Sequence, residues 1–77
     1  MAEKWTMARY RKYCRETKQD FEADFPDLAE DSTAWFDMAQ GILATNPALK
    51  QWLLSDRFSS IKHNLAEAFA EDLSCGV

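Results

Sequence analysis

Core-facing positions recur at helical spacing in the first part of the chain. With residues placed 100° apart, one arc collects Met7, Tyr10, Tyr13, Cys14, Thr17 and Phe21. This pattern predicts a helix over about 3–24, with a stripe of basic residues on its opposite side formed by Lys4, Arg11, Arg15 and Lys18. Pro26 is expected to end the helix, because the residue before a proline disfavours helical dihedrals.

A second, wider apolar arc follows a polar linker. It consists of Trp35, Phe36, Met38, Ala39, Ile42 and Leu43. The arc predicts a central helix over about 33–45. Asp31 or Ser32 is expected to cap it, since either side chain can accept hydrogen bonds from the free N–H groups of the first turn.

The pair Asn46-Pro47 predicts a new helix start, with Asn46 as the cap and Pro47 at the first helical position. A short helix over about 47–54 would carry Leu49, Trp52 and Leu53. Ser55 would cap, or bend into, a last helix over about 56–74. Its core face would be Phe58, Ile61, Leu65, Phe69 and Leu73, and Gly76 would stop it.

The composition supports an all-α fold. The chain has one Val and two Ile against eleven Ala and seven Leu, and β-strands favour β-branched residues. We therefore expect residues 1–77 to form one domain, a compact bundle of three to four helices. Because 77 residues are near the lower limit for a single hydrophobic core, a bound partner or a second copy could add stability.

Charge is strongly segregated along the chain. Residues 1–19 carry a net charge of +4, residues 20–37 a net charge of −7, and the rest a net charge of −1. The stretch DFEADFPDLAED, residues 20–31, contains six carboxylates and no Lys or Arg: Asp20, Glu22, Asp24, Asp27, Glu30 and Asp31. Such segregation predicts a basic and an acidic patch in the folded protein.

The acidic stretch admits three interpretations. A calcium loop of the EF-hand type is disfavoured, because Phe25 stands where the loop requires glycine. A solvated turn would explain Glu30, Asp31 and, less directly, Asp27, because acidic residues there favour the N-terminal dipole of the following helix. It does not explain Asp20, Glu22 and Asp24, which oppose the dipole at the end of the first helix. We favour a functional acidic surface, and the solvated turn stays open.

The sequence gives little support for catalysis or for a bound metal or cofactor. His63 is the only histidine, glycines occur only at 41 and 76, and no serine lies in a G-x-S-x-G context. Cys14 lies on the apolar face, where a thiol is expected to be inert packing. A site built from Cys14, Cys75 and His63 would lack the close-spaced ligand pair that is usual for zinc. We expect a non-enzymatic protein without a metal or cofactor.

The preferred hypothesis is therefore a non-catalytic protein-binding module. An acidic patch complements the cationic groove of a nucleic-acid-binding protein, so carboxylates would stand where phosphates bind and occlude the groove. Trp5 and Trp52 are the expected aromatic anchors, whereas Trp35 is expected in the core. In composition alone the chain is similar to small phage-encoded inhibitors of restriction and CRISPR systems, which implies a DNA-mimicking inhibitor.

Two alternatives remain open. The stripe Lys4, Arg11, Arg15 and Lys18 could track a phosphate backbone, which would make the protein a small nucleic-acid-binding regulator. The basic helix of one copy could instead dock on the acidic stretch of another, giving a homodimer or a structural adaptor.

The expected location is the reducing cytosol. Two cysteines do not make a disulfide framework, and the start MAEKWTMARY lacks the apolar region of a secretory signal. The longest apolar runs are far shorter than the ~20 residues that span a bilayer. We therefore expect no membrane association.

Overall fold

The computed structural model describes residues 4–60 and 64–77, and all regular elements there are helical. In chain order they are α1 (Met7–Asp24), the 3₁₀ turn η1 (Leu28–Glu30), α2 (Ser32–Thr45), α3 (Pro47–Trp52), the π-helical turn η2 (Leu53–Arg57) and α4 (Leu65–Cys75). The predicted all-α bundle is confirmed.

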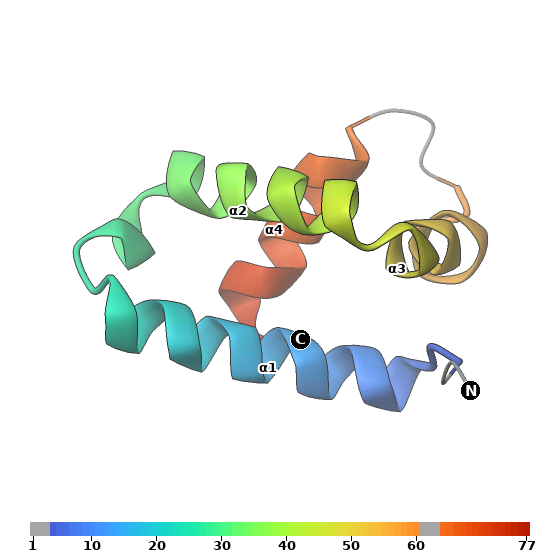
Figure 1. Cartoon of the computed structure of the whole chain (residues 1–77), viewed down its shortest axis with the longest axis horizontal. Coiled ribbons are helices and arrows are strands. Elements are labelled where there is room, and N and C mark those ends of the chain that lie inside the picture. The colour runs from blue at the N-terminus through green and yellow to red at the C-terminus, as the bar shows by residue number, and fades with distance from the viewer. Residues whose placement is uncertain (1–3, 61–63) are drawn as a thin grey trace.

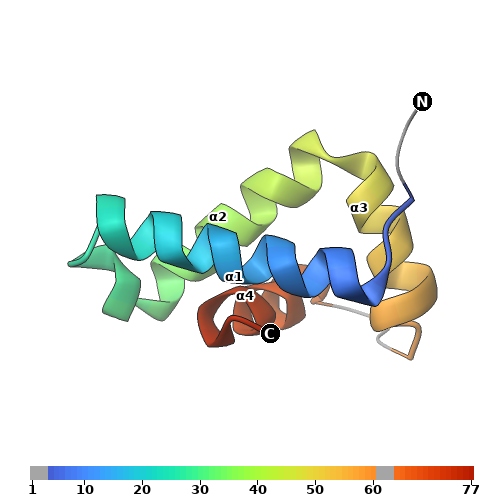
Figure 2. The same ribbon diagram turned by 90° about the horizontal axis from the view of Figure 1, so that it is seen from below.

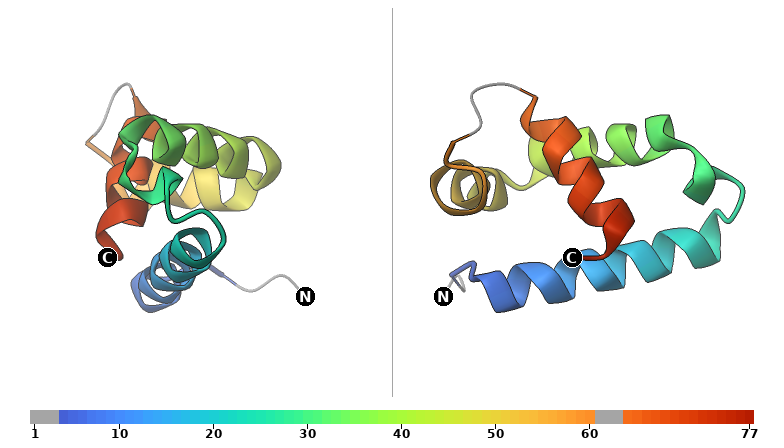
Figure 3. Two further views of the ribbon diagram at one scale, coloured as in Figure 1. Left: turned by 90° about the vertical axis from the view of Figure 1, so that its left-hand side faces the viewer. Right: turned by 180° about the vertical axis from the view of Figure 1, so that it is seen from behind.

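Helix α4 lies between the two longest helices. The α1–α2 turn lies at one end of the molecule, whereas α4 crosses behind α2 in the middle of the view and packs against both α1 and α2 (Figure 1). The view from behind shows α4 running from the level of α2 to that of α1 (Figure 3). Helix α3 and η2 lie at the other end, near the N-terminal end of α1 (Figure 2). The acidic α1–α2 turn therefore projects away from α3.

Local caps define most helix ends. Thr6 accepts a hydrogen bond from the Arg9 N–H at 3.1 Å, and Asp31 accepts one from Thr33 at 2.9 Å. Asn46 caps α3 through the Leu49 N–H at 3.2 Å, with Pro47 at the first helical position. The predictions for Asp31, Asn46 and Pro47 are confirmed.

Two further helix ends agree with the sequence pattern. Helix α1 ends at Asp24, two residues before Pro26. Gly76 ends α4 in the left-handed conformation with φ +68°, and its N–H donates to the Leu73 carbonyl while that of Val77 donates to Asp72. This pair of bonds is the Schellman arrangement that glycine accommodates without a Cβ clash.

The start of α1 is later than predicted. Residues 4–6 are described and precede the helix, which begins at Met7 rather than at position 3. The cap explains the difference, because Thr6 has an extended backbone (φ −135°, ψ 168°) and uses its hydroxyl to satisfy a first-turn N–H group.

The prediction of one last helix over 56–74 is wrong in its first half. Helix α3 continues into η2 and stops at Phe58, and α4 begins only at Leu65. Ser55 does not cap a helix, since its hydroxyl donates back to the Gln51 carbonyl at 3.0 Å. Ile61 and His63 lie outside the described residues.

An ion pair explains why no straight helix connects these segments. Arg57 contacts Asp72 at 3.0 Å, fifteen positions further along the chain. On a straight helix those residues would be roughly 22 Å apart, at 1.5 Å per residue. The chain must reverse between them, and Asn64 helps by adopting a left-handed conformation (φ 61°), which asparagine tolerates better than most residues.

The core collects side chains from α1, α2, α3, η2 and α4. Its buried members are Tyr10, Cys14, Trp35, Ala39, Leu43, Leu49, Leu53, Phe69, Ala70 and Leu73. The predicted core positions of Cys14 and Trp35 are confirmed. Phe58 packs against this core as expected, but from the segment after η2 instead of from α4.

Candidate functional site

The six predicted carboxylates of residues 20–31, named here the acidic turn, lie at the α1–α2 end of the molecule. Asp20, Glu22 and Asp24 stand on the last turns of α1, and Asp27 follows Pro26. Glu30 belongs to η1, and Asp31 precedes α2. All six are exposed. Because Asp20 to Asp24 are helical, they do not form the calcium loop that was already disfavoured from the sequence.

Local structure accounts for two of the six carboxylates. Asp31 caps α2, and Glu22 lies 3.6 Å from Lys18 in an i,i+4 ion pair. Within residues 4–60 and 64–77, the side chains of the other four make no hydrogen bond or ion pair; these are Asp20, Asp24, Asp27 and Glu30. Intramolecular contacts therefore leave most of this charge uncompensated.

Exposed apolar side chains stand inside the acidic turn. Phe25 is 51% exposed and Leu28 is 44% exposed. The Phe25 ring lies 5.7 Å from that of Phe21, which rests on Trp35 at 4.7 Å. A shallow hollow of about 460 Å³ adjoins them, lined by Phe21, Leu28, Asp31, Thr33, Ala34, Asp37 and Met38. The turn thus presents an apolar tip surrounded by carboxylates.

The sequence reasoning missed Phe25 and Leu28 as exposed apolar groups. A signal was present, because both flank Pro26 at the predicted end of the helix, where side chains leave the core face. Tryptophan is among the residues most enriched in binding hot spots, which favoured Trp5 and Trp52 as the predicted anchors instead.

The predicted anchors Trp5 and Trp52 are both half-buried and pack against the core cluster. The Trp5 ring lies edge-on to Tyr13 at 5.4 Å, and the Arg9 guanidinium sits 4.1 Å from its centroid. The Trp52 ring lies 5.2 Å from that of Tyr10. Part of each surface is therefore committed to the fold, and their role as partner anchors stays a prediction.

The basic stripe lies on α1 and just before it. Lys4, Arg11 and Arg15 are exposed, whereas Lys18 is half-buried and paired with Glu22. The stripe runs from the residue Lys4 before α1 to Lys18, which pairs with Glu22. The basic stripe and the acidic turn therefore adjoin each other along α1.

A buried polar cluster connects α1, η2 and α4. The Tyr10 hydroxyl donates to the Asp72 carboxylate at 2.7 Å, and Arg57 donates to both carboxylate oxygens at 3.0 and 3.2 Å. Burial, followed by the hydrogen bond to Asp72, raises the pKa of Tyr10. The hydrogen bonds that Arg57 itself donates to Asp72 raise the pKa of Arg57. The sequence analysis did not anticipate this cluster, since Asp72 shows no local sign of burial.

The hydrogen bonds of this cluster connect three segments of the fold. All buried side-chain N and O atoms of the described residues have hydrogen-bond partners, and both carboxylate oxygens of Asp72 accept hydrogen bonds. Cys14 lies beside Tyr10, and burial raises its pKa to about 11, which keeps the thiol protonated near neutral pH.

The described residues contain no group of three His, Cys, Asp or Glu side chains placed to hold a metal ion. Cys14 and Cys75 are free, the first buried and the second exposed. No helix in the part of the chain that was searched is both long and apolar enough to cross a membrane.

Comparison of the chain with protein-family models, with curated proteins and with solved structures found no match. The functional argument therefore rests on the geometry of the residues themselves.

Proposed function

We propose that this protein is a non-catalytic binding module whose acidic turn contacts a cationic surface of a larger protein. One observation carries the proposal. Phe25 and Leu28 are exposed among six carboxylates, four of which make no hydrogen bond or ion pair within the described chain. Exposing two large apolar groups costs hydrophobic stabilisation, and the cost is recovered when a partner covers them.

The two kinds of side chain would act differently in binding. Desolvated apolar anchors supply most of the affinity at protein interfaces, so Phe25 and Leu28 would slow dissociation. Uncompensated carboxylates attract a cationic surface over roughly a Debye length of 8–10 Å and mainly speed association. The acidic turn combines both in twelve consecutive residues.

A cationic surface that binds nucleic acid is the preferred target class. Carboxylates in the acidic turn would occupy the places of phosphates, and the protein would inhibit by occlusion. This mode of action agrees with the compositional similarity to small phage-encoded inhibitors of restriction and CRISPR systems. Trp5 and Trp52 could extend the contact with the surface that they leave exposed.

The first experiment is a tagged pull-down from the native cell after nuclease treatment, eluted across a salt series. We expect a stoichiometric cationic protein that moderate salt releases. The purified partner is then tested with two variants, Asp20→Asn/Glu22→Gln/Asp24→Asn and Phe25→Ala/Leu28→Ala. Each should weaken binding by roughly tenfold or more, which corresponds to about 1.4 kcal/mol.

Matched controls come from η2. Leu54 is as exposed as Leu28, and Asp56 is an exposed carboxylate outside the acidic turn. The variants Leu54→Ala and Asp56→Asn should bind like the parent protein. Unchanged binding by the triple amide variant would exclude the acidic turn as the contact.

The nucleic-acid alternative has its own test. If nuclease treatment removes every captured protein, the basic stripe becomes the candidate surface. A gel-shift assay with Arg11→Ala/Arg15→Ala then decides, because phosphate contacts by these side chains predict a weaker and less salt-dependent complex. Identical shifts for parent and variant would eliminate this alternative.

A further inference from the structure

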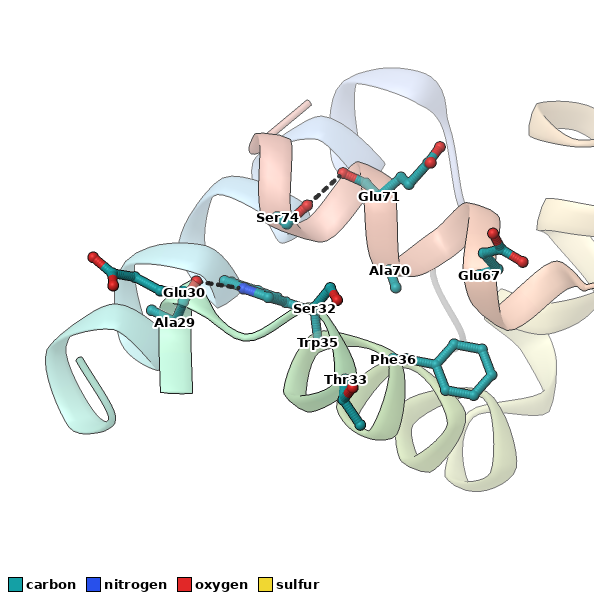
Figure 4. Close-up of a pocket in the computed structure, with 10 residues that line it drawn as sticks. All are labelled: Ala29, Glu30, Ser32, Thr33, Trp35, Phe36, Glu67, Ala70, Glu71 and Ser74. Carbon is teal, nitrogen blue, oxygen red and sulfur yellow. Dashed lines mark hydrogen bonds between the residues drawn. The ribbon is translucent and has the colours of Figure 1, made fainter. Parts of the chain in front are cut away.

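A groove lies along α2 and α4, which pack against each other, and it begins beside η1. Its volume is about 510 Å³, and its lining side chains come from η1, α2 and α4, with Ala70 directed from α4 toward α2 (Figure 4). The apolar part of the lining consists of Ala29, Trp35, Phe36 and Ala70. The size lies within the range of about 300–1,000 Å³ typical of binding pockets.

Carboxylates border this groove, and no basic residue lines it. Glu30 stands at the η1 end, and Glu67 and Glu71 stand one turn apart on α4. These three side chains make no ion pair with any described residue. Like charges at i,i+4 destabilise a helix, so a pair of cations at the same spacing would offset the repulsion between Glu67 and Glu71.

The chain itself carries such a pair. Arg11 and Arg15 are exposed at i,i+4 on α1, and neither makes an ion pair within residues 4–60 and 64–77. Four residues rise about 6 Å along any α-helix, so the two arginines match the two glutamates in spacing. In an antiparallel arrangement Arg11 would meet Glu71 while Arg15 meets Glu67.

We propose that the protein self-associates, with Arg11 and Arg15 of one copy docked on the α2–α4 groove of a second copy. The guanidinium groups pair with Glu67 and Glu71. The aliphatic parts of the arginine side chains cover the apolar lining, and a guanidinium can stack on Phe36. This inference goes beyond the proposed function and does not depend on it.

Three observations favour a second copy over another occupant. The charges are complementary in sign, number and spacing. Arg15 and Lys18 flank the C-terminal end of α4 at Gly76, so the basic stripe and the groove both border α4. A two-fold axis beside α4 would then form the contact twice. Finally, a 77-residue chain has little core of its own, and dimerisation adds buried surface.

The test uses sedimentation velocity on the purified full chain at low salt, from about 10 µM to 1 mM. We expect reversible self-association that weakens as salt rises. Glu67→Lys/Glu71→Lys should raise the dissociation constant at least roughly tenfold, and Arg11→Glu/Arg15→Glu should do the same. Mixing the two charge-reversed variants should restore association to within about threefold of the parent.

Controls separate this result from misfolding and from other contacts. Circular dichroism melting checks each variant, and Glu67→Gln/Glu71→Gln replaces the lysine pair if that pair does not fold. Lys12→Glu, on α1 but already within 3.9 Å of Glu16, should have a smaller effect.

Three outcomes would overturn the proposal: a monomer at every concentration, self-association that neither charge reversal weakens, or failure of the mixed variants to associate. Loss of nucleic-acid binding by Arg11→Glu/Arg15→Glu in a protein that stays monomeric would assign the arginines to nucleic acid instead. The sedimentation experiment uses the purified protein without a partner. A negative result would therefore not count against the proposed binding by the acidic turn.

Discussion

The Tyr10 hydroxyl donates a 2.7 Å hydrogen bond to the Asp72 carboxylate across 62 positions of the chain. Arg57 meets the same carboxylate from η2, so one aspartate holds α1, η2 and α4 together. The Asp72 side chain is 10% exposed and that of Arg57 is 32% exposed. Losing a partner from a buried charged cluster is costly because the remaining charge stays buried.

Removal of the Asp72 carboxylate should therefore destabilise the fold strongly. We expect Asp72→Ala to lower the free energy of unfolding by about 2–4 kcal/mol, measured by urea denaturation followed by circular dichroism. Tyr10→Phe removes one hydrogen bond and should cost only about 1 kcal/mol. Glu71→Ala, at the neighbouring exposed position, should change stability by less than about 0.5 kcal/mol. Equal effects of Asp72→Ala and Glu71→Ala would contradict the structural role of the cluster.

Stability should fall at alkaline pH. Burial raises the pKa of Cys14 from 9.0 to about 11, so the folded state favours the protonated thiol. The resulting stabilisation is complete below pH 9 and is lost as the pH rises from 9 through 11. The shift corresponds to at most about 2–3 kcal/mol. The pKa of Tyr10 is also raised, chiefly by burial, which extends the loss of stability above pH 10.

Melting temperatures of the parent, Cys14→Ala and Cys75→Ala from pH 8 to 11 test this prediction. Cys14→Ala should show a shallower decline between pH 9 and 11, whatever its stability at pH 8. Cys75 is exposed, so Cys75→Ala should follow the parent curve. A parent protein whose melting temperature is flat up to pH 11 would refute the expectation.

The two glycines should respond to alanine in opposite directions. Gly76 ends α4 at φ +68°, and an added Cβ would also lie 3.0 Å from Cδ of Lys18. Gly76→Ala should therefore destabilise by about 1 kcal/mol. Gly41 lies inside α2 with nothing within 4 Å of an added Cβ, so Gly41→Ala should stabilise by about 0.5–1 kcal/mol. Thermal denaturation gives the sign of the change in melting temperature for each variant. Two changes of the same sign would be inconsistent with this account.

The carboxylates and the apolar residues of the acidic turn should affect different rate constants of binding. With a purified partner, Asp20→Asn/Glu22→Gln/Asp24→Asn should lower the association rate and reduce its salt dependence, because the long-range attraction is lost. Phe25→Ala/Leu28→Ala should raise the dissociation rate and leave the salt dependence unchanged, because anchors act after encounter. Surface plasmon resonance across a salt series distinguishes the two. Identical kinetic signatures for both variants would disprove the division of roles.

The correct predictions concern local interactions. Asp31 caps α2 because its carboxylate reaches an N–H group two residues away, and Pro47 suits a first helical position because its ring fixes φ. Both effects operate within one helical turn and can be inferred from residues that are adjacent in the sequence. The core positions of Trp35 and Phe69 follow from helical periodicity, which needs only the order of the residues.

The incorrect prediction of one helix over 56–74 concerns a contact between distant residues. The helical pattern from 56 onward is compatible with one long helix, whereas the Arg57–Asp72 ion pair requires the chain to reverse. The exposure of a side chain also depends on what packs over it. Trp5 lies off the predicted core arc, yet its ring packs edge-on against Tyr13. Phe25 stands one turn after the half-buried Phe21, yet it is 51% exposed.

The order of the residues alone thus determined the helical class, the caps and the separation of basic from acidic charge along the chain, because these depend on neighbours within a few positions. Tertiary packing decided which apolar groups stay exposed and which carboxylate is buried. It also decided where Glu67 and Glu71 border a groove, because burial and proximity arise only when segments far apart in the chain are brought together.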